Sequence, residues 1–171
     1  MAATEAVRAL EAAFERIART RMAGLPLNNP ALRVEAVGFR ALDQNHFVGV
    51  LVTPWAVNLV VLGAASSNDL LLAADRRRSW DFPSGGYEFM GGDEPECGPY
   101  QFCSLFSPAF EFADQEAAVA TAGAIMAGLF AATAADAGDE REAARLAGRS
   151  VIHARTSRRG FLRGMLGVRK A

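Results

Sequence analysis

Two apolar runs decide the fold of this chain, Phe47-Val48-Gly49-Val50-Leu51-Val52 and Ala56-Val57-Asn58-Leu59-Val60-Val61-Leu62. Both are rich in β-branched residues, and Thr53-Pro54-Trp55 separates them. Short runs of this kind are typical of strands, and Pro54 cannot continue a central strand because it lacks an N–H donor. We therefore predict two successive strands, of which the one over 56–62 is covered on both faces.

The residues before these runs predict a further strand and an N-terminal helix. Val37, Phe39 and Ala41 alternate with small or polar residues, and turn residues follow at 43–45, so 33–41 and 47–52 should pair as a hairpin. Farther upstream, Thr4 is a suitable helix N-cap. Apolar residues then recur at three- and four-residue spacing, namely Val7, Leu10, Phe14, Ile17 and Ala18. An amphipathic helix should therefore precede a loop over 24–30.

The second half of the chain predicts weaker strands and a long helix. Residues 69–73 and 87–90 are weak strand candidates, the intervening Arg76-Arg77-Arg78 is predicted to be a solvated loop, and 100–106 is a stronger strand. Asp114 can cap an alanine-rich helix over 115–135. Its large residues on one side are Val119, Met126, Leu129 and Phe130. Gly123 and Gly128 would be tolerated if this helix lies close to a sheet.

These elements predict an α+β fold with a single domain over residues 1–150. A mainly antiparallel sheet of about five strands should be flanked by the N-terminal helix and the alanine-rich helix. A short helix over 140–147 precedes a flexible basic tail over 151–171.

The charge is distributed unevenly along the 171 residues. Residues 141–171 carry nine Lys and Arg against one acid, a net charge of +8, and the first 140 residues carry a net charge of -9. The whole chain, at -1 with 51% hydrophobic residues, is typical neither of a disordered protein nor of a nucleic-acid binder. No export segment opens the chain, and the uncharged run 117–135 has too few large apolar residues for stable membrane insertion. We expect a cytoplasmic protein.

Three stretches in the middle of the chain resemble a known family. They are Thr53-Pro54-Trp55-Ala56-Val57-Asn58-Leu59, Trp80-Asp81-Phe82-Pro83-Ser84-Gly85-Gly86-Tyr87-Glu88-Phe89, and Tyr100-Gln101-Phe102-Cys103-Ser104-Leu105-Phe106-Ser107-Pro108 with Glu111-Phe112-Ala113-Asp114-Gln115. Over about residues 34–120 the chain resembles the HybE/HupJ/HoxT family of nickel-iron hydrogenase assembly chaperones. The resemblance implies a non-enzymatic cytoplasmic factor, without a cofactor, that serves the hydrogenase small-subunit precursor. It would delay export of that twin-arginine protein until cofactors are inserted, with other maturation proteins as further partners.

The motif positions supply the candidate partner-binding residues. A peptide with two arginines followed by Phe and Leu needs carboxylates beside an apolar pocket, because guanidinium pairs bidentately with carboxylate. The candidates are Trp55, Asn58, Trp80, Tyr87, Glu88, Cys103, Ser104, Phe106, Glu111, Phe112 and Asp114. Each also has a structural interpretation: core packing for the aromatic residues, a solvated surface for the acids, a helix cap for Asp114 and a structural hydrogen bond for Asn58.

A redox or metal-handling factor that protects the immature small subunit is the alternative from another class. It would require Cys97, Cys103, His46 and His153 to converge, although the close Cys and His spacings of familiar zinc sites do not occur. Cys103 or Ser104 with His46 lacks the motifs of a nucleophilic enzyme, so no catalytic residue is predicted.

The basic tail contains a run similar to the twin-arginine motif itself. Ser157, Arg158, Arg159, Phe161 and Leu162 match its pattern at a position where it cannot direct export. The match either follows from the arginine-rich composition or mimics the ligand by docking in the signal site. The same bases could instead bind an anionic membrane surface.

Overall fold

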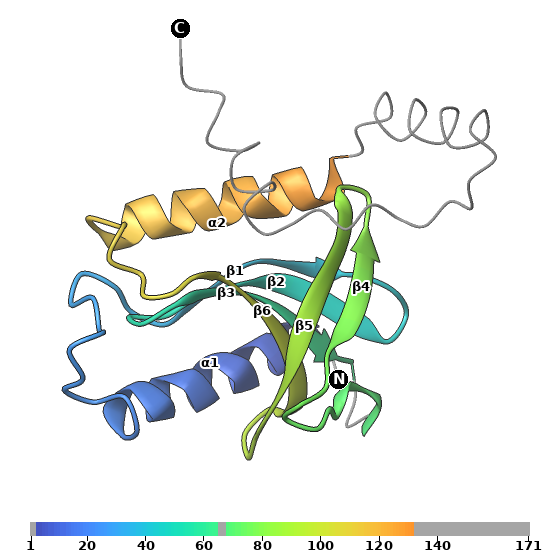
Figure 1. Ribbon diagram of the computed structural model, residues 1–171, viewed down its shortest axis with the longest axis horizontal. Helices are drawn as coiled ribbons and strands as arrows, with labels where there is room; N and C mark the ends of the chain where they lie inside the picture. Colours follow the sequence, from blue (N-terminus) through green and yellow to red (C-terminus); the bar gives the residue numbers. More distant parts are fainter. Residues whose placement is uncertain (1–2, 65–67, 132–171) are drawn as a thin grey trace, which may run out of the picture.

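The computed structural model describes residues 3–64 and 68–131, and it confirms the α+β prediction. A curled antiparallel sheet lies between two helices, α1 on one face and α2 on the other (Figure 1). The elements are α1 Ala3–Arg19, β1 Glu35–Ala41, β2 His46–Val52, β3 Val57–Gly63, the 3-10 helix η1 Asn68–Leu70, β4 Arg78–Phe82, β5 Gly85–Glu94, β6 Gly98–Phe106 and α2 Gln115–Phe130. The six strands have the order β1-β2-β3-β6-β5-β4, one strand more than about five.

The hairpin and the doubly covered strand are confirmed. β2 pairs with β1 and with β3, and β3 also pairs with β6, so β3 lies in the interior of the sheet. All residues of β3 except Gly63 are buried. Its odd-numbered residues face α2 and its even-numbered residues face α1, as strand alternation requires. An uninterrupted apolar run was therefore the correct signal for a strand with a helix on each side.

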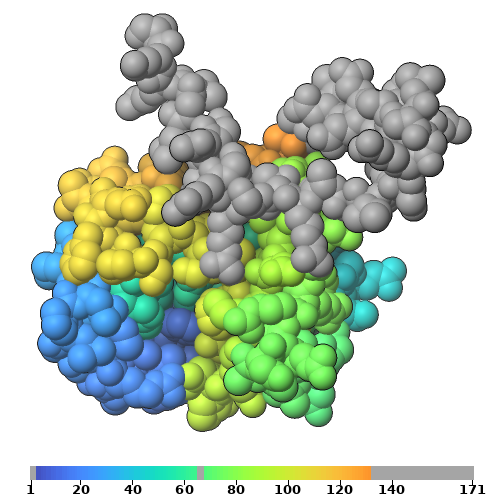
Figure 2. All heavy atoms as spheres, viewed as in Figure 1, coloured from blue at the N-terminus to red at the C-terminus, as the bar shows by residue number. Residues whose placement is uncertain are grey.

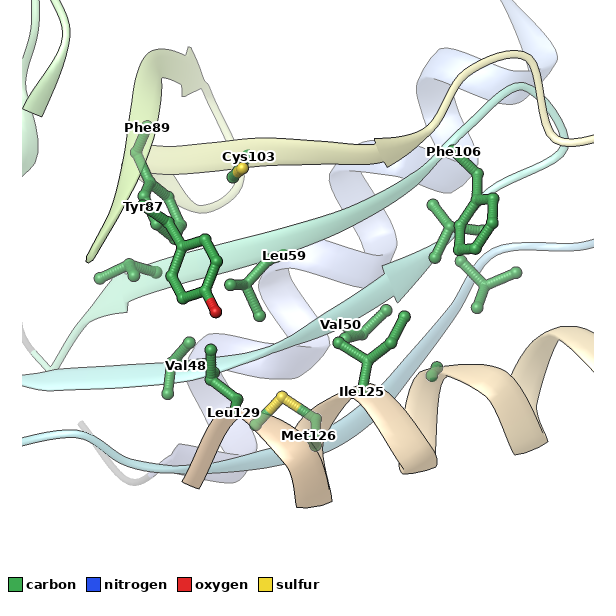
Figure 3. Packing of buried hydrophobic residues seen from close by; sticks show 14 of the residues in the cluster. Val48, Val50, Leu59, Tyr87, Phe89, Cys103, Phe106, Ile125, Met126 and Leu129 are labelled. Carbon is green, nitrogen blue, oxygen red and sulfur yellow. The ribbon is translucent and has the colours of Figure 1, made fainter. Parts of the chain in front are cut away.

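The larger core lies between the sheet and α2 (Figure 3). Tyr87 and Cys103 point from β5 and β6 toward Leu59, while Met126 and Leu129 face them from α2. Asp114 caps α2, because its Oδ1 accepts the Ala117 N–H at 2.8 Å. The buried residues of α2 are Ala118, Ala122, Ile125, Met126 and Leu129.

Two details of α2 differ from the prediction. Val119 is only half-buried, whereas Ile125 takes a core position, because the buried stripe lies slightly to one side of the predicted one. Gly123 is exposed, and a Cβ placed there would have nothing within 4 Å, so close approach to the sheet does not explain it. Residues 132–135 of the predicted helix and the predicted helix over 140–147 lie outside the described residues.

The smaller core lies under α1. Leu10, Phe14 and Ile17 are buried against strand residues that include Val60 and Tyr100. Val7 and Ala18, predicted on this face, are half-buried, and Ala6 and Ala13 are buried instead. Small alanines let the helix approach the sheet closely, which a pattern of large apolar residues does not reveal.

The segment between β3 and β5 departs most from the prediction. The predicted strand over 69–73 is wrong: η1 occupies its start, and Leu70 is buried. The predicted loop at Arg76–Arg78 ends one residue early, because Arg78 begins β4 and lies over the Trp80 ring at 4.1 Å. The strand predicted over 87–90 extends to the ten residues of β5.

β5 changes its partner along its length. Residues 90–94 pair with β6, while residues 85–89 pair with β4. The β4–β5 ribbon therefore turns away from β6, as Figure 1 shows. In the part of the chain that the structure describes, no helix has the length and hydropathy needed to cross a membrane.

Candidate functional site

The sheet face on the α1 side brings together four of the predicted site residues. Asn58 on β3 pairs with Ser104 on β6, and strand alternation places both on the face that α1 partly covers. Trp55 precedes β3, and its ring stacks on Phe14 with the ring centroids 6.3 Å apart. Glu88 lies on the same face of β5, because Tyr87 and Phe89 on either side point into the α2 core.

Three residues outside the predicted set complete this face. Met90 on β5 pairs with Phe102 on β6, and both are half-buried. Asp81 on β4 lies on the same face as Glu88, because Ser79 pairs with Glu88 and Trp80 points into the opposite core. A predicted strand over β4 would have identified Asp81, because strand alternation places it on the opposite face from Trp80 and Phe82. We call these residues the α1-side site: Trp55, Asn58, Asp81, Glu88, Met90, Phe102 and Ser104.

A space-filling view shows a hollow on the described surface between the N-terminal segment and the sheet (Figure 2). Blue atoms of the N-terminal segment, yellow atoms of the β6–α2 connection and yellow-green atoms of β5 and β6 surround it. Teal atoms from the region of β3 lie at its floor. Half-buried apolar side chains beside exposed carboxylates on one sheet face are chemically suited to a basic, partly apolar peptide.

Asn58 has an unusual environment in this site. Its exposed fraction is only 7%, and its Oδ1 has no hydrogen-bond partner among the described residues. The predicted structural hydrogen bond is therefore not made by this oxygen. A buried amide oxygen left without a donor costs about 1–3 kcal/mol, which makes it an unusual feature of a folded core.

Five other candidates have side chains in the α2-side core. Trp80 donates its Nε1–H to Gln101 Oε1 at 2.7 Å, and the rings of Phe106 and Phe112 meet edge to face at 5.0 Å. Tyr87 shares a hydrogen bond of 2.9 Å with Ser84, and burial raises the pKa of its phenol. Cys103 has an exposed fraction of 1%. These contacts give each side chain a structural role in the fold.

The remaining acids lie at the loop end of the sheet. Asp114 acts as the α2 cap, so its carboxylate already accepts a hydrogen bond. Glu111 is exposed in the connection between β6 and α2, next to Phe110, whose ring is 54% exposed. This connection is tied to the loop after α1, because Asn29 Nδ2 donates to the carbonyls of Ala109 and Phe112. Glu111 therefore lies on an exposed connection and not on a strand of the α1-side site.

The three predicted metal ligands that the structure describes, Cys97, Cys103 and His46, do not form a metal site. Cys97 belongs to the α1-side cluster and Cys103 to the α2-side core, on opposite faces of the sheet. Among the described residues, no group of three or more His, Cys, Asp or Glu could hold a metal ion. Burial, together with the charges of Glu94 and Glu96, raises the pKa of the Cys97 thiol to about 12, so that it stays protonated and weakly nucleophilic. His153 lies outside the described residues.

His46 instead takes part in a polar network. Its Nδ1 lies 2.8 Å from Asp43 Oδ2 and its Nε2 lies 2.6 Å from Asp69 Oδ2, while its ring meets Trp80 edge to face. Desolvation tends to raise the pKa of Asp43, but hydrogen bonds from the His46 ring and from the Asn45 amide outweigh it and lower that pKa. This network fastens the β1–β2 turn to η1, which accounts for the buried histidine without a metal.

Comparison with known proteins places the chain in a family. The family model described as "[NiFe]-hydrogenase assembly, chaperone, HybE" matches residues 5–164. The chain belongs to this family. Its members are assembly chaperones, a non-enzymatic role, so the HybE-family protein described here is a NiFe-hydrogenase assembly chaperone. The candidate residues of the signal-like tail, from Ser157 to Leu162, lie outside the described residues and stay a prediction.

Individual relatives carry related names. The chain is 46% identical over 132 residues to Protein HoxT of Cupriavidus necator, covering 70% of this chain and 73% of that protein. It is 40% identical over 161 residues to the hydrogenase expression/formation protein HupJ of Bradyrhizobium diazoefficiens, covering 94% and 89%. A HupJ of Rhodobacter capsulatus named a probable rubredoxin is 41% identical over 126 residues, 74% of this chain but 45% of that protein. The solution structure of Escherichia coli HybE aligns with a TM-score of 0.49 at 25% identity, covering 66% and 68%.

Proposed function

We propose that this chaperone binds the small-subunit precursor of a NiFe-hydrogenase through its twin-arginine signal. It would hold the precursor in the cytoplasm and delay export until the cofactors are inserted, in concert with other maturation proteins. The family membership supports the hydrogenase role. The finer statement, that the signal is the bound segment, rests on the chemistry of the α1-side site.

One observation carries this proposal. Two exposed carboxylates, Asp81 and Glu88, lie on the same face as the half-buried apolar side chains of Met90 and Phe102. A twin-arginine signal presents two guanidinium groups followed by apolar residues. Guanidinium binds carboxylate with two parallel N–H bonds, and the apolar residues need burial. The α1-side site therefore offers both kinds of contact on one sheet face.

Titration with a synthetic small-subunit signal peptide tests the proposal. The full chain should bind the peptide, and replacing the arginine pair by lysine should weaken binding because the bidentate fork is lost. Asp81→Asn and Glu88→Gln should weaken it as well. Glu15→Gln, on an exposed residue of α1, is the matched control. Equal affinity for the arginine and lysine peptides would contradict the proposal.

The redox or metal-handling role remains a second candidate for one reason only. The Rhodobacter relative is named a probable rubredoxin, and this chain matches less than half of its length. Iron in sulfur-ligated sites is held by cysteine thiolates, and the two cysteines of this chain lie on opposite faces of the sheet. Metal analysis of purified protein tests this role, because a metal content abolished by Cys103→Ser would support it.

A further inference from the structure

We infer that Asn58 is a buried acceptor for one guanidinium group of a bound arginine-containing peptide. The inference rests on the proposed function, since it names the residue that would distinguish arginine from lysine in the same site. It starts from the unpartnered Oδ1 of an amide that is 7% exposed, on the sheet face that α1 partly covers.

Two buried oxygens among the described residues lack a hydrogen-bond partner, and they differ in setting. Asn28 lies in the loop after α1, is half-buried, and donates its Nδ2 to the Met22 carbonyl at 2.5 Å. Solvent can therefore reach its surroundings. Asn58 lies between Leu51 of β2 and Ser104 of β6, inside an otherwise apolar strand. A leucine there would carry no unpaired polar atom, so the amide needs a reason other than folding.

The position of Asn58 restricts what can donate to it. β2 and β6 pair with β3 on both sides, so an added strand cannot bring its main-chain amides to this residue. A peptide side chain that reaches the face of the sheet can supply the donor instead. Arginine has a long apolar stem and five N–H donors, which suits an acceptor set within an apolar strand.

The aromatic residues on the same side of the sheet as Asn58 favour guanidinium over ammonium. Trp55 is half-buried beside the start of β3, and Phe102 lies on the same face of β6. Guanidinium is weakly hydrated and stacks flat on aromatic rings, whereas the ammonium of lysine is compact and strongly hydrated. An amide oxygen on a sheet face that also carries aromatic rings therefore accepts from arginine at a smaller desolvation cost. Glu88 or Asp81 at the rim would bind the second guanidinium of the pair.

This assignment predicts opposite effects of Asn58→Leu on stability and on binding. The free protein should become more stable, because the unpaired oxygen is removed and an apolar side chain takes its place. The affinity for the Arg-Arg signal peptide should fall about tenfold or more, as expected when a hydrogen bond to a charged group is lost. Asn58→Asp keeps an acceptor and should preserve the preference for arginine.

Gln101→Leu is the matched control. Gln101 is also a buried amide, on the strand next to β3, but both of its polar atoms have hydrogen-bond partners. Its Oε1 accepts from Trp80 and its Nε2 donates to the Leu70 carbonyl. Its removal should lower stability and leave peptide affinity unchanged, measured at a temperature where the variant is folded.

Peptides with Arg-Arg, Lys-Arg and Arg-Lys pairs complete the test by calorimetric titration. Wild type should bind both lysine-containing peptides more weakly than the Arg-Arg peptide. Asn58→Leu should bind one of these two peptides as well as it binds the Arg-Arg peptide, because it no longer distinguishes arginine from lysine at that position. If wild type prefers Arg-Arg and Asn58→Leu keeps the full preference at both positions, the inference is overturned while the proposed function stands. If wild type does not bind the Arg-Arg peptide, the proposed function itself fails. A variant that is less stable and binds normally would assign Asn58 a purely structural role.

Discussion

Arg16 on α1 donates its Nη2–H to Glu94 Oε2 on β5 at 2.7 Å, and this contact joins the end of the N-terminal helix to the β5–β6 hairpin. The Glu94 side chain is only 8% exposed and also pairs with Arg21. Arg16 reaches Glu96 as well, and that hydrogen bond lowers the pKa of the Glu96 carboxylate. One buried carboxylate therefore serves two arginines at the border of the α1-side site.

Removing the charge of Glu94 should loosen this junction. Glu94→Gln leaves two guanidinium groups with a neutral partner, so we expect the thermal midpoint to fall by more than about 3 °C. Glu15→Gln is the control, because the Glu15–Arg19 pair is exposed and its atoms are 3.9 Å apart. The control should change the midpoint by less than about 1 °C. Circular dichroism melts measure both, and equal shifts would argue against a specific role for Glu94.

Two glycines should respond oppositely to alanine. Gly123 is an exposed position in the middle of α2 with open space where a Cβ would lie, so Gly123→Ala should stabilise the protein by about 0.5–1 kcal/mol. At Gly49 of β2 a Cβ would lie 2.2 Å from Cδ2 of Phe39. Gly49→Ala must displace that ring from the α1-side cluster and should destabilise by about 1–3 kcal/mol. Urea unfolding of the two variants checks both signs.

The Asp43–His46 contact should contribute a pH-dependent part of the stability. The pKa of Asp43 is lower in the folded protein than its ordinary value of 3.8, so folding favours the carboxylate. This contribution is complete above about pH 4 and is lost as the pH falls through the folded pKa. Asp43→Asn lacks it at every pH. The difference in unfolding free energy between wild type and Asp43→Asn should therefore be largest near neutral pH and shrink below about pH 4; a constant difference would exclude the linkage.

The sequence predicted those parts of the fold that depend on local pattern. β3 was recognisable because its apolar residues are continuous, and the β1–β2 hairpin because turn residues separate two alternating runs. β4 was not recognisable from the sequence, because it has only five residues, starts with Arg78 and depends on pairing with β5. The cation–π contact of Arg78 with Trp80 is a tertiary effect that local charge does not reveal.

The candidate site was predicted in part for the same reason. Trp55, Asn58, Glu88 and Ser104 come from three separate stretches of sequence, and only the strand register places them on one face. Near Asn58 that register shifts, because Val57 pairs with Phe106 while Asn58 pairs with Ser104. A bulge moves every following side chain relative to its neighbour strand, and no periodicity in one strand predicts it. Asp81 and Phe102 were missed because their faces depend on the same pairing.

The last prediction concerns the twin-arginine-like run that contains Arg158 and Arg159. The described chain leaves α2 beside the β4–β5 turn, where the Ser84 N–H donates to the Leu129 carbonyl at 3.2 Å, so it exits close to the ribbon that carries Asp81 and Glu88. A linker as long as the sequence separation between Ala131 and Arg158 has a root-mean-square reach of about 30 Å, so the length of the chain permits the predicted docking.

Tethering of this kind gives an effective concentration on the order of mM. Against a site with micromolar affinity, a strongly docking run would exclude the precursor by about a thousandfold, so a working chaperone requires a run that binds weakly enough to be displaced. Ending the chain at Ser150 should then tighten signal-peptide binding by at least about threefold, because the competitor is removed. Replacing Arg158 and Arg159 by lysine in the full chain should reproduce most of this gain while keeping the tail charge. Unchanged affinity after truncation would show that the run does not compete. A gain on truncation that the lysine variant does not share would assign the effect to the basic charge of the tail instead of the arginine pair.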